Sequence, residues 1–241
     1  MKGFFKKFRD AQRPFCTMIV AAAGSSTRMG GGNKLFLPLD GVPVLARTLL
    51  AVDAVALVDE ILIAAREEDL LAIGDLCKTF GIAKPTKVIR GGASREESVY
   101  LASLEADSRC ELLAVQDGDR PLVTPALIER VIRRAITTAA AAPAVPVKDT
   151  VKVARDGAVT DTPDRATLYA VQTPQVFDAA LLRAALQAGL EAGAALTDDC
   201  SAVERMGKQV YLTEGEESNI KITTPIDLVV AEAILQERQG G

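Results

Sequence analysis

The chain has 241 residues, enough for one large domain or two small ones, and its apolar and charged fractions are typical of a soluble globular protein. A net charge of −4 argues against general binding of nucleic acid. The sequence contains no histidine, which excludes a histidine general base, a Ser-His-Asp triad and a histidine-ligated metal.

The N-terminal segment and the cysteines indicate the cellular compartment of the protein. Residues 1–17 begin with a basic, amphipathic segment without the apolar core of a signal peptide, and we expect them to form an N-terminal extension. A membrane-surface helix is the less favoured alternative for that extension. The four cysteines are widely spaced and form no C-x-x-C pair, so we expect reduced thiols, no zinc site and a cytoplasmic protein. Because no apolar run approaches transmembrane length, we expect no membrane partner.

The first predicted strand, Met18–Ala23, leads into a loop of small residues that begins at Gly24. Such a loop exposes backbone N–H groups and can cradle phosphate oxygens. Arg28 and Lys34 add two positive charges, so a triphosphate is the ligand that would use the whole loop. The spacing fits neither a P-loop nor the G-x-G-x-x-G fingerprint, and for the glycines alone a flexible surface loop is an equal alternative.

Helices and strands then alternate along the chain. The pattern predicts a helix that starts at Pro43, a strand at 60–65, a helix at 70–80, a strand at 87–89, a helix capped by Ser94, a strand at 111–116 and a helix after Thr124. This order predicts an α/β fold, Rossmann-like, with a mostly parallel twisted sheet and helices on both faces. Ligands in such folds lie beyond the carboxyl ends of the strands, where Gly24, Gly91 and Asp117 stand.

Residues 144–175 interrupt this alternation. Strand patterns at 146–154 and 158–160 flank the turn signal Arg155-Asp-Gly157, which predicts a protruding β-hairpin arm, and a strand at 168–174 returns. An isolated hairpin needs apolar cover, so we expect the arm to form a homodimer. Further helices are predicted at 179–192, after Thr197 and from Thr224 to about 239, with strands at 209–213 and 219–223. Residues 18–241 should therefore form a single domain.

Several polar residues at the predicted ligand edge suit phosphate chemistry. Asp117 follows a buried strand and is a candidate ligand for Mg²⁺, with Asp119 as a second candidate carboxylate. Arg120 could clamp a second phosphate. Lys221 lies alone in an apolar strand, and the pattern by itself also fits an edge residue that faces water.

The ordered motifs resemble those of nucleotidyltransferases with the nucleotide-diphospho-sugar transferase fold, and most closely the 2-C-methyl-D-erythritol 4-phosphate cytidylyltransferase family. The resemblance spans most of residues 17–235 and rests on Ala22-Ala-Gly24 with Arg28 and Lys34, Gly91-Gly92 with Arg95 and Ser98, Asp117 with Arg120-Pro121, Val147–Lys152, Asp164-Arg165, Gln172–Gln175, Thr197-Asp198 and Asn219–Thr223. The chain departs from the family pattern at Thr27, at Asn33-Lys-Leu35 and at Gln116-Asp-Gly-Asp-Arg-Pro121.

The resemblance implies an enzyme that transfers CMP from CTP to methylerythritol phosphate with release of pyrophosphate. It assigns Arg28, Lys34 and Lys221 to catalysis, Ala22, Ala23, Gly24, Gly92 and Ser98 to CTP, Arg120, Thr150, Arg165, Thr173 and Thr197 to the alditol phosphate, and Asp117 to Mg²⁺. It also implies that Thr150 and Arg165 act from the partner subunit's arm.

Two alternative functions remain open on the sequence. A ribitol 5-phosphate cytidylyltransferase would share the fold and the chemistry, and would differ only in the acceptor. A catalytically silent, nucleotide-binding regulatory protein is the alternative from another class. The presence of Lys34, Asp117 and Lys221 argues against that second alternative.

Overall fold

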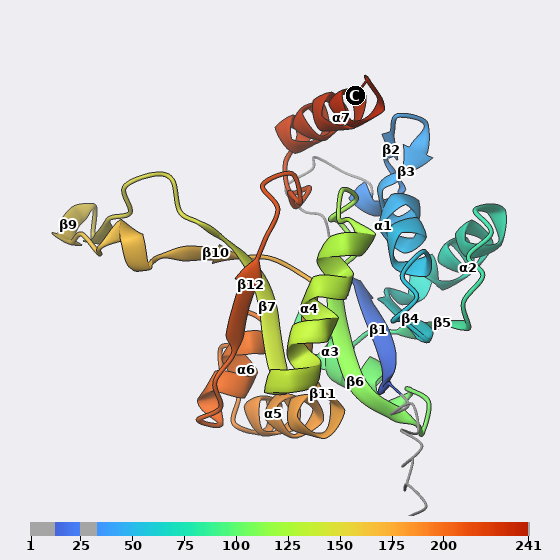
Figure 1. The fold of residues 1–241 in the computed structure, drawn as a ribbon, viewed down its shortest axis with the longest axis horizontal. Helices are drawn as coiled ribbons and strands as arrows, with labels where there is room; N and C mark the ends of the chain where they lie inside the picture. Colours follow the sequence, from blue (N-terminus) through green and yellow to red (C-terminus); the bar gives the residue numbers. More distant parts are fainter. Residues whose placement is uncertain (1–12, 25–32, 241) are drawn as a thin grey trace, which may run out of the picture.

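An eight-stranded sheet runs through the computed structural model, which describes residues 13–24 and 33–240 (Figure 1). Its strands are β1 (Phe15–Ala22), β4 (Glu60–Ala65), β5 (Thr86–Arg90), β6 (Cys110–Asp117), β7 (Ala140–Pro146), β10 (Tyr169–Val171), β11 (Gln175–Asp178) and β12 (Tyr211–Glu214). The strand order is β10-β7-β11-β6-β1-β4-β5, and β12 pairs with β7 beside this path. Strands β6, β1, β4 and β5 are parallel neighbours, whereas β11 runs antiparallel to both β6 and β7. The predicted α/β fold with a mostly parallel sheet is confirmed.

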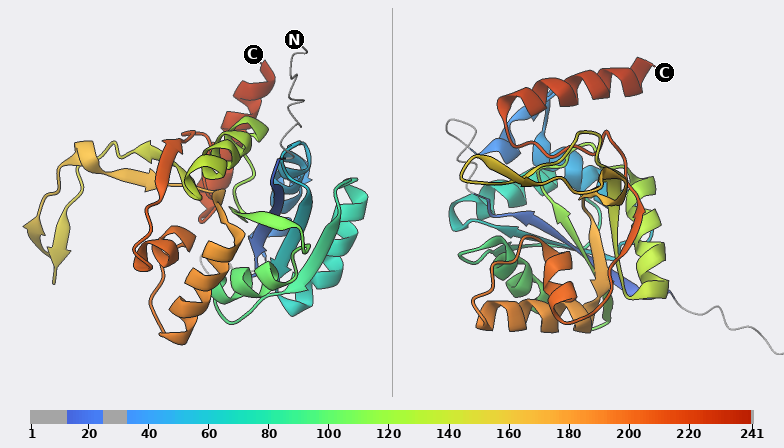
Figure 2. Two further views of the ribbon diagram at one scale, coloured as in Figure 1. Left: turned by 60° about the horizontal axis from the view of Figure 1, so that its bottom comes forward. Right: turned by 90° about the vertical axis from the view of Figure 1, so that its left-hand side faces the viewer.

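Helices cover both faces of the sheet because side chains alternate along each buried strand. In β1, Met18 and Val20 join one apolar cluster and Ile19 joins the other. Helices α1 (Val44–Asp53), α2 (Leu70–Thr79), α4 (Pro125–Thr138) and α7 (Pro225–Gly240) contribute to the first cluster; α3 (Arg95–Leu104), α5 (Ala179–Glu191) and α6 (Asp199–Arg205) contribute to the second. Figure 2 shows these two layers from the sides. No helix in the described residues is long and apolar enough to span a membrane.

The remaining short elements are the 3-10 helices η2 (Lys34–Phe36), η3 (Glu67–Asp69) and η4 (Arg165–Thr167) and two small hairpins. One hairpin joins β2 (Pro38–Leu39) to β3 (Val42–Pro43). The other joins β8 (Val153–Arg155) to β9 (Ala158–Asp161) and is the predicted arm, which projects from the body beside β10 (Figure 1). Its turn is formed by Asp156 and Gly157, both at positive φ (52° and 81°), which is the pattern of a two-residue type I′ turn.

Some element boundaries differ from the sequence prediction. The first strand begins at Phe15, three residues earlier than expected, because Phe15 and Cys16 already pair with β6. The N-cap of α6 is Asp198, which accepts a hydrogen bond from the Ser201 amide, so the predicted cap at Thr197 is wrong by one residue.

The strand predicted at 219–223 does not form. The Asn219–Thr223 segment crosses the carboxyl edge of the sheet instead, and the amide of Ile222 donates to the Asp119 carbonyl over 2.8 Å. Asn219 donates through its side chain to the carbonyl of Thr173, 3.0 Å away. Contacts with loops thus take the place of a strand ladder, and they hold this segment over the ends of the strands.

The packing of the second cluster gives a stability prediction. Leu62 of β4 is completely buried, whereas Leu71 of α2 is 85% exposed. We expect Leu62→Ala to lower the free energy of unfolding by about 2–5 kcal/mol, because it removes transfer free energy and leaves a cavity. Leu71→Ala is the matched control and should change stability by less than about 0.5 kcal/mol. Chemical denaturation measures both, and equal losses would contradict this assignment of the core.

Candidate functional site

A polar pocket lies at the carboxyl edge of the parallel strands. Its volume is about 400 Å³, and its walls come from five chain segments that are far apart in the sequence. The lining residues are Ala21–Gly24, Lys34, Leu35, Gly92–Arg95, Ser98, Asp117, Asp119, Lys221 and Thr223. The loops after β1 and β5 and the end of β6 therefore meet where parallel α/β sheets bind their ligands.

Gly118 allows the ends of β1 and β6 to approach each other closely. Its amide donates to the carbonyl of Ala21 over 3.0 Å. A Cβ atom at this position would lie 3.0 Å from that carbonyl oxygen and 3.1 Å from a methyl group of Leu45. Both contacts are tighter than an ordinary van der Waals contact, so a larger residue would require these neighbours to shift by a few tenths of an ångström.

The second wall is the loop that precedes α3. Ser94 caps the helix by accepting from the Glu97 amide, as the S-x-x-E spacing predicts. The Glu97 carboxylate accepts from the amide of Ala93 at 2.6 Å. The Ser98 hydroxyl accepts from the Gly92 amide and donates to the Ser94 carbonyl, so it holds this loop as well as lining the pocket.

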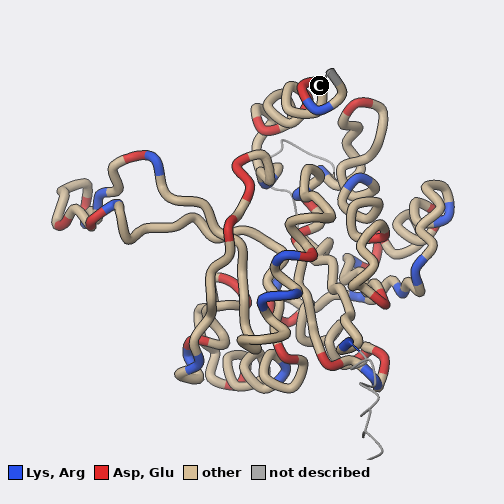
Figure 3. The backbone as a smooth tube through the Cα atoms, in the orientation of Figure 1, with Lys and Arg blue, Asp and Glu red and all other residues tan. Residues whose placement is uncertain are grey.

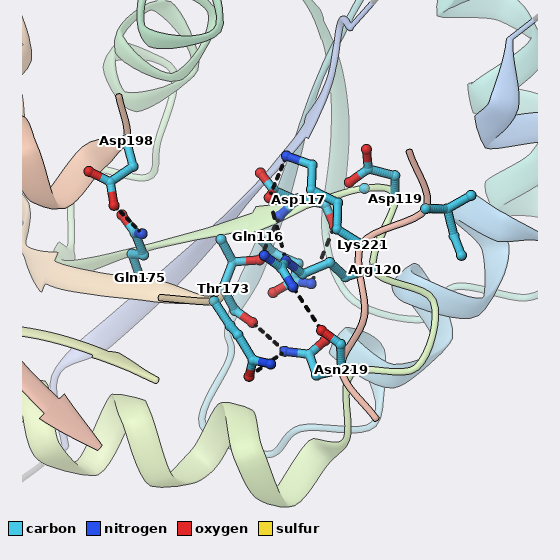
Figure 4. Close-up of polar contacts among 12 residues, drawn as sticks. Gln116, Asp117, Asp119, Arg120, Thr173, Gln175, Asp198, Asn219 and Lys221 are labelled. Carbon is cyan, nitrogen blue, oxygen red and sulfur yellow. Dashed lines mark hydrogen bonds and ion pairs between the residues drawn. The ribbon is translucent and has the colours of Figure 1, made fainter. Parts of the chain in front are cut away.

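The floor of the pocket is the carboxylate of Asp117, which is only 6% exposed (Figure 4). Lys221 lies 2.9 Å from it, Arg95 3.2 Å and Arg120 3.5 Å. Burial by itself would raise the pKa of Asp117, but the charges of Arg95, Lys221 and Arg120 hold that pKa well below its usual range. Asp117 is therefore ionised at neutral pH, and its charge is balanced within the pocket.

Lys34 extends into the pocket from η2 and is fixed at its tip. Its Nζ atom lies 2.5 Å from Oδ2 of Asp119 and donates to the carbonyl of Ile222 over 2.7 Å. Asn33 caps η2 by accepting from the Leu35 amide, and it donates to the buried carboxylate of Asp69 over 2.9 Å.

The residue before Lys34 thus has a structural function in this chain. Arg66 also donates to Asp69, over 2.7 Å. The departure from the family pattern at Asn33 therefore links the lysine-bearing turn to the end of β4, through Asp69 and Arg66.

The structure brings most of the predicted residues together. Within the described chain, all predicted catalytic, nucleotide-binding and metal-binding residues line the pocket: Lys34, Lys221, Ala22, Ala23, Gly24, Gly92, Ser98 and Asp117. Arg28 lies outside the described residues.

The predicted acceptor-binding residues are more scattered. Thr173 and Arg120 lie behind the floor, where the Thr173 hydroxyl accepts from the Asp117 amide and Arg120 donates to the carbonyl of Asn219. Thr197 is exposed just before α6. Thr150 and Arg165 are exposed on the arm and do not line this pocket, and Arg165 donates to the backbone of Lys148.

Two charged residues in the pocket region had no role assigned from the sequence. Arg95 lines the pocket and pairs with both Asp117 and Asp199, and these two carboxylates raise its pKa against the effect of burial. Asp199 is completely buried, and burial raises its pKa while Arg95 acts in the opposite direction. The run Thr197-Asp-Asp199 resembles an ordinary helix cap, and only burial distinguishes its second aspartate.

The pocket also offers oxygen ligands of the kind that Mg²⁺ prefers. Asp117 and Asp119 both line the pocket, and Oδ1 of Asp119 is buried without a hydrogen-bond partner among the described residues. Mg²⁺ commonly uses one or two carboxylates together with substrate phosphates. In the described parts of the chain no group of three or more His, Cys, Asp or Glu residues could hold a metal ion alone. The donor set therefore fits Mg²⁺ bound together with a phosphate ligand.

Comparison with known proteins identifies close relatives. Residues 16–237 match the family model described as 2-C-methyl-D-erythritol 4-phosphate cytidylyltransferase. Curated relatives of that name include a protein of Caldanaerobacter subterraneus, 46% identical over 91% of this chain and 98% of its own length, and one of Synechococcus elongatus, 44% identical over 92% and 97%. The structure of 4-diphosphocytidyl-2C-methyl-D-erythritol synthase from Anaerococcus prevotii is similar, with a TM-score of 0.84, 34% identity and coverage of 92% and 99%.

Proposed function

The chain belongs to the 2-C-methyl-D-erythritol 4-phosphate cytidylyltransferase family, and from this premise we propose how its residues carry out the reaction of that family. The enzyme transfers CMP from CTP to 2-C-methyl-D-erythritol 4-phosphate and releases pyrophosphate, a step of the non-mevalonate isoprenoid pathway. The observation that supports the assignment of roles is the convergence of Lys34, Lys221 and Asp117 on one pocket, which Ala21–Gly24 also line.

The reaction is a nucleophilic substitution at phosphorus. A phosphate oxygen of methylerythritol phosphate forms a bond to the α-phosphorus of CTP, and the bond from that phosphorus to the bridging oxygen of pyrophosphate breaks. The leaving pyrophosphate takes the bonding electron pair. The attacking phosphate is already anionic, so no general base is needed, which agrees with a chain that has no histidine. Catalysis therefore consists of positioning and charge stabilisation.

Lys34 and Arg28 together would bind the triphosphate and stabilise the charge of the transition state. Lys221 would bind the α-phosphate. The ammonium groups of Lys34 and Lys221 come from segments nearly 190 positions apart and face the same cavity. Each contacts a carboxylate, Asp119 or Asp117, which keeps it extended toward the phosphate site. Donors fixed in this way act on growing charge without reorganising first.

We assign the nucleotide base to the loops on either side of the pocket. Backbone groups of Ala22, Ala23, Gly24 and Gly92, with Ser98, are suited to reading the edge of cytosine. The support for this is that these residues line the pocket and that the loop before α3 is held by its own hydrogen bonds.

Asp117, with Asp119 as a second carboxylate, would hold Mg²⁺. When bound, the ion would neutralise charge on the phosphates of CTP. The support for this proposal is that both carboxylates line the pocket and that Oδ1 of Asp119 has no hydrogen-bond partner in the described part of the chain.

We propose that the alditol phosphate is bound by Arg120, Thr173 and Thr197, together with Thr150 and Arg165 of a second subunit. The arm supports a homodimer because its apolar side chains lack cover: Val153 is 46% exposed, Val159 60% and Tyr169 49%. Charged residues of both signs also lie along the arm, where the tube is coloured blue and red in Figure 3. A planar guanidinium such as that of Arg165 can grip a phosphate with two hydrogen bonds.

We further propose a cytoplasmic location. The support is that all four cysteines are free and that Cys16 and Cys200 are buried. Thiols of this kind are typical of proteins from reducing compartments.

The choice of substrates is the first prediction. We expect rapid pyrophosphate release with CTP and methylerythritol phosphate, and much slower release with UTP, ATP or GTP, because the loops around Gly92 are expected to read cytosine. A coupled pyrophosphate assay with methylerythritol phosphate and ribitol 5-phosphate as acceptors measures both choices. Equal turnover with ATP would overturn the assignment of the base site, and faster turnover with ribitol 5-phosphate would overturn the acceptor.

The second prediction concerns Lys34. We expect Lys34→Ala to lower kcat by about 10²–10³, because the ammonium group faces charge that grows in the transition state. Lys78→Ala, which changes an exposed lysine of α2, is the control and should leave kcat unchanged. Steady-state kinetics measures both variants. A Lys34→Ala enzyme within about threefold of wild type would remove Lys34 from this mechanism.

The third prediction concerns the metal. Asp117→Asn should raise the Mg²⁺ concentration needed for half-maximal activity, because a neutral amide is a poorer ligand for a hard cation. Asp119→Asn should have a smaller effect of the same sign. Activity measured over a series of Mg²⁺ concentrations tests both variants, and an unchanged titration for Asp117→Asn would contradict its role.

The fourth prediction concerns shared sites. Mixing Arg165→Ala chains with an equal amount of Lys34→Ala chains should restore about a quarter of wild-type activity, because random exchange makes half of the dimers mixed and each of these carries one intact site of two. Arg155→Ala, in the exposed β8 strand of the arm, is the control and should remain active alone. If subunit exchange is demonstrated and no activity returns, each chain builds its own site.

A further inference from the structure

Asp199, the first residue of α6, has no place in the mechanism described above. Its side chain is completely buried, and within the described chain its one ion pair is with Arg95, whose Nη2 lies 2.9 Å from Oδ2. Neither carboxylate oxygen has any other hydrogen-bond partner among the described residues. Its charge is therefore compensated chiefly by one guanidinium.

Such a pair is hard to explain by stability alone. Removing a carboxylate from water costs free energy that a single buried partner often fails to return, and apolar side chains of similar volume can be as stable. A buried charge of this kind requires another explanation, and the position of its partner provides one.

Arg95 is shared between two carboxylates. Besides its contact with Asp199, its Nε and Nη2 atoms lie 3.3 Å and 3.2 Å from Oδ1 of Asp117. Lys221 contacts the other oxygen, Oδ2, of the same carboxylate. The orientation of Asp117 in the pocket is thus set by a cation on each of its oxygens, and one of these cations is itself held by Asp199.

The α6 helix that carries Asp199 is anchored to the sheet. Gln175 of β11 donates to the carboxylate of Asp198 over 2.8 Å and accepts from the amide of Cys200 over 3.0 Å. Gln175 is paired with Val115 of β6, two residues before Asp117. Asp199 is therefore fixed to the same strand pair that carries the pocket floor.

We propose that Asp199 is a positioning residue that holds Arg95 against Asp117 and thereby sets the orientation of that carboxylate for the nucleotide and its metal. This inference rests on the proposed function of Asp117. Asp199 touches neither substrate nor metal and acts only through Arg95.

The first test needs no substrate. The Nε–H signal of Arg95, assigned by its loss in Arg95→Lys, should exchange slowly with water in the wild-type protein and rapidly in Asp199→Asn. Glu60→Gln is the matched control, because Glu60 is also a buried carboxylate. Glu60 lies at the amino end of β4, whereas the pocket lies at the carboxyl ends of the strands. The Arg95 signal should be unchanged in that variant, and an unchanged signal in Asp199→Asn would overturn the proposal.

The second test is a double-mutant cycle of kcat and of the Mg²⁺ requirement. Asp199→Asn should lower kcat about tenfold and raise the Mg²⁺ requirement in the wild-type background, but change kcat by less than about threefold when Asp117 is already Asn. Glu60→Gln should change the melting temperature but should change neither kcat nor the Mg²⁺ requirement. Additive effects of Asp199→Asn and Asp117→Asn would overturn the proposal.

The two tests separate this proposal from the proposed function. If the wild-type protein releases no pyrophosphate from CTP and methylerythritol phosphate, the proposed function fails. The exchange measurement on Arg95 then still decides whether Asp199 holds that guanidinium.

Discussion

The pocket depends on the ion pairs around one ionised carboxylate, which is buried at the end of β6. Asp117 can remain charged there only because Arg95, Arg120 and Lys221 surround it. These cations come from α3, from the loop after β6 and from the segment before α7, so the charge balance fixes three distant parts of the chain relative to one another. Removing any one of them would leave a buried charge less compensated, and we regard the cluster as one electrostatic unit.

Backbone geometry at the same edge makes this unit possible. Gly118 lets β1 and β6 approach closely, and the Asn219–Thr223 segment lies across the strand ends instead of forming a strand. In that position Lys221 donates a hydrogen bond to Asp117, and the carbonyl of Ile222 accepts one from Lys34. The two lysines are consequently linked through one short segment, Asn219–Thr223, which leads into α7.

The arm differs from the pocket because its apolar side chains lack cover within one chain. Its β8–β9 hairpin pairs with no strand of the main sheet, and its valines remain exposed in the single chain. A second copy of the chain would provide the apolar cover that a two-stranded hairpin needs in water. The proposed positions of Thr150 and Arg165 in a neighbouring site depend on this assembly, whereas the pocket around Asp117 is built within one chain.

The sequence by itself determined the α/β alternation, the arm with its Asp156-Gly157 turn, and the edge where the pocket lies, because hydrophobic periodicity and turn residues are local signals. The ordered motifs, through their resemblance to the cytidylyltransferase family, also placed Lys34, Asp117 and Lys221 in one site. Only the tertiary structure decided that the segment around Lys221 is no strand, since its apolar pattern fits a ladder and a buried crossing equally well. It alone identified Asp199, because burial and the choice of ion-pair partner arise from contacts between distant segments that no local pattern records.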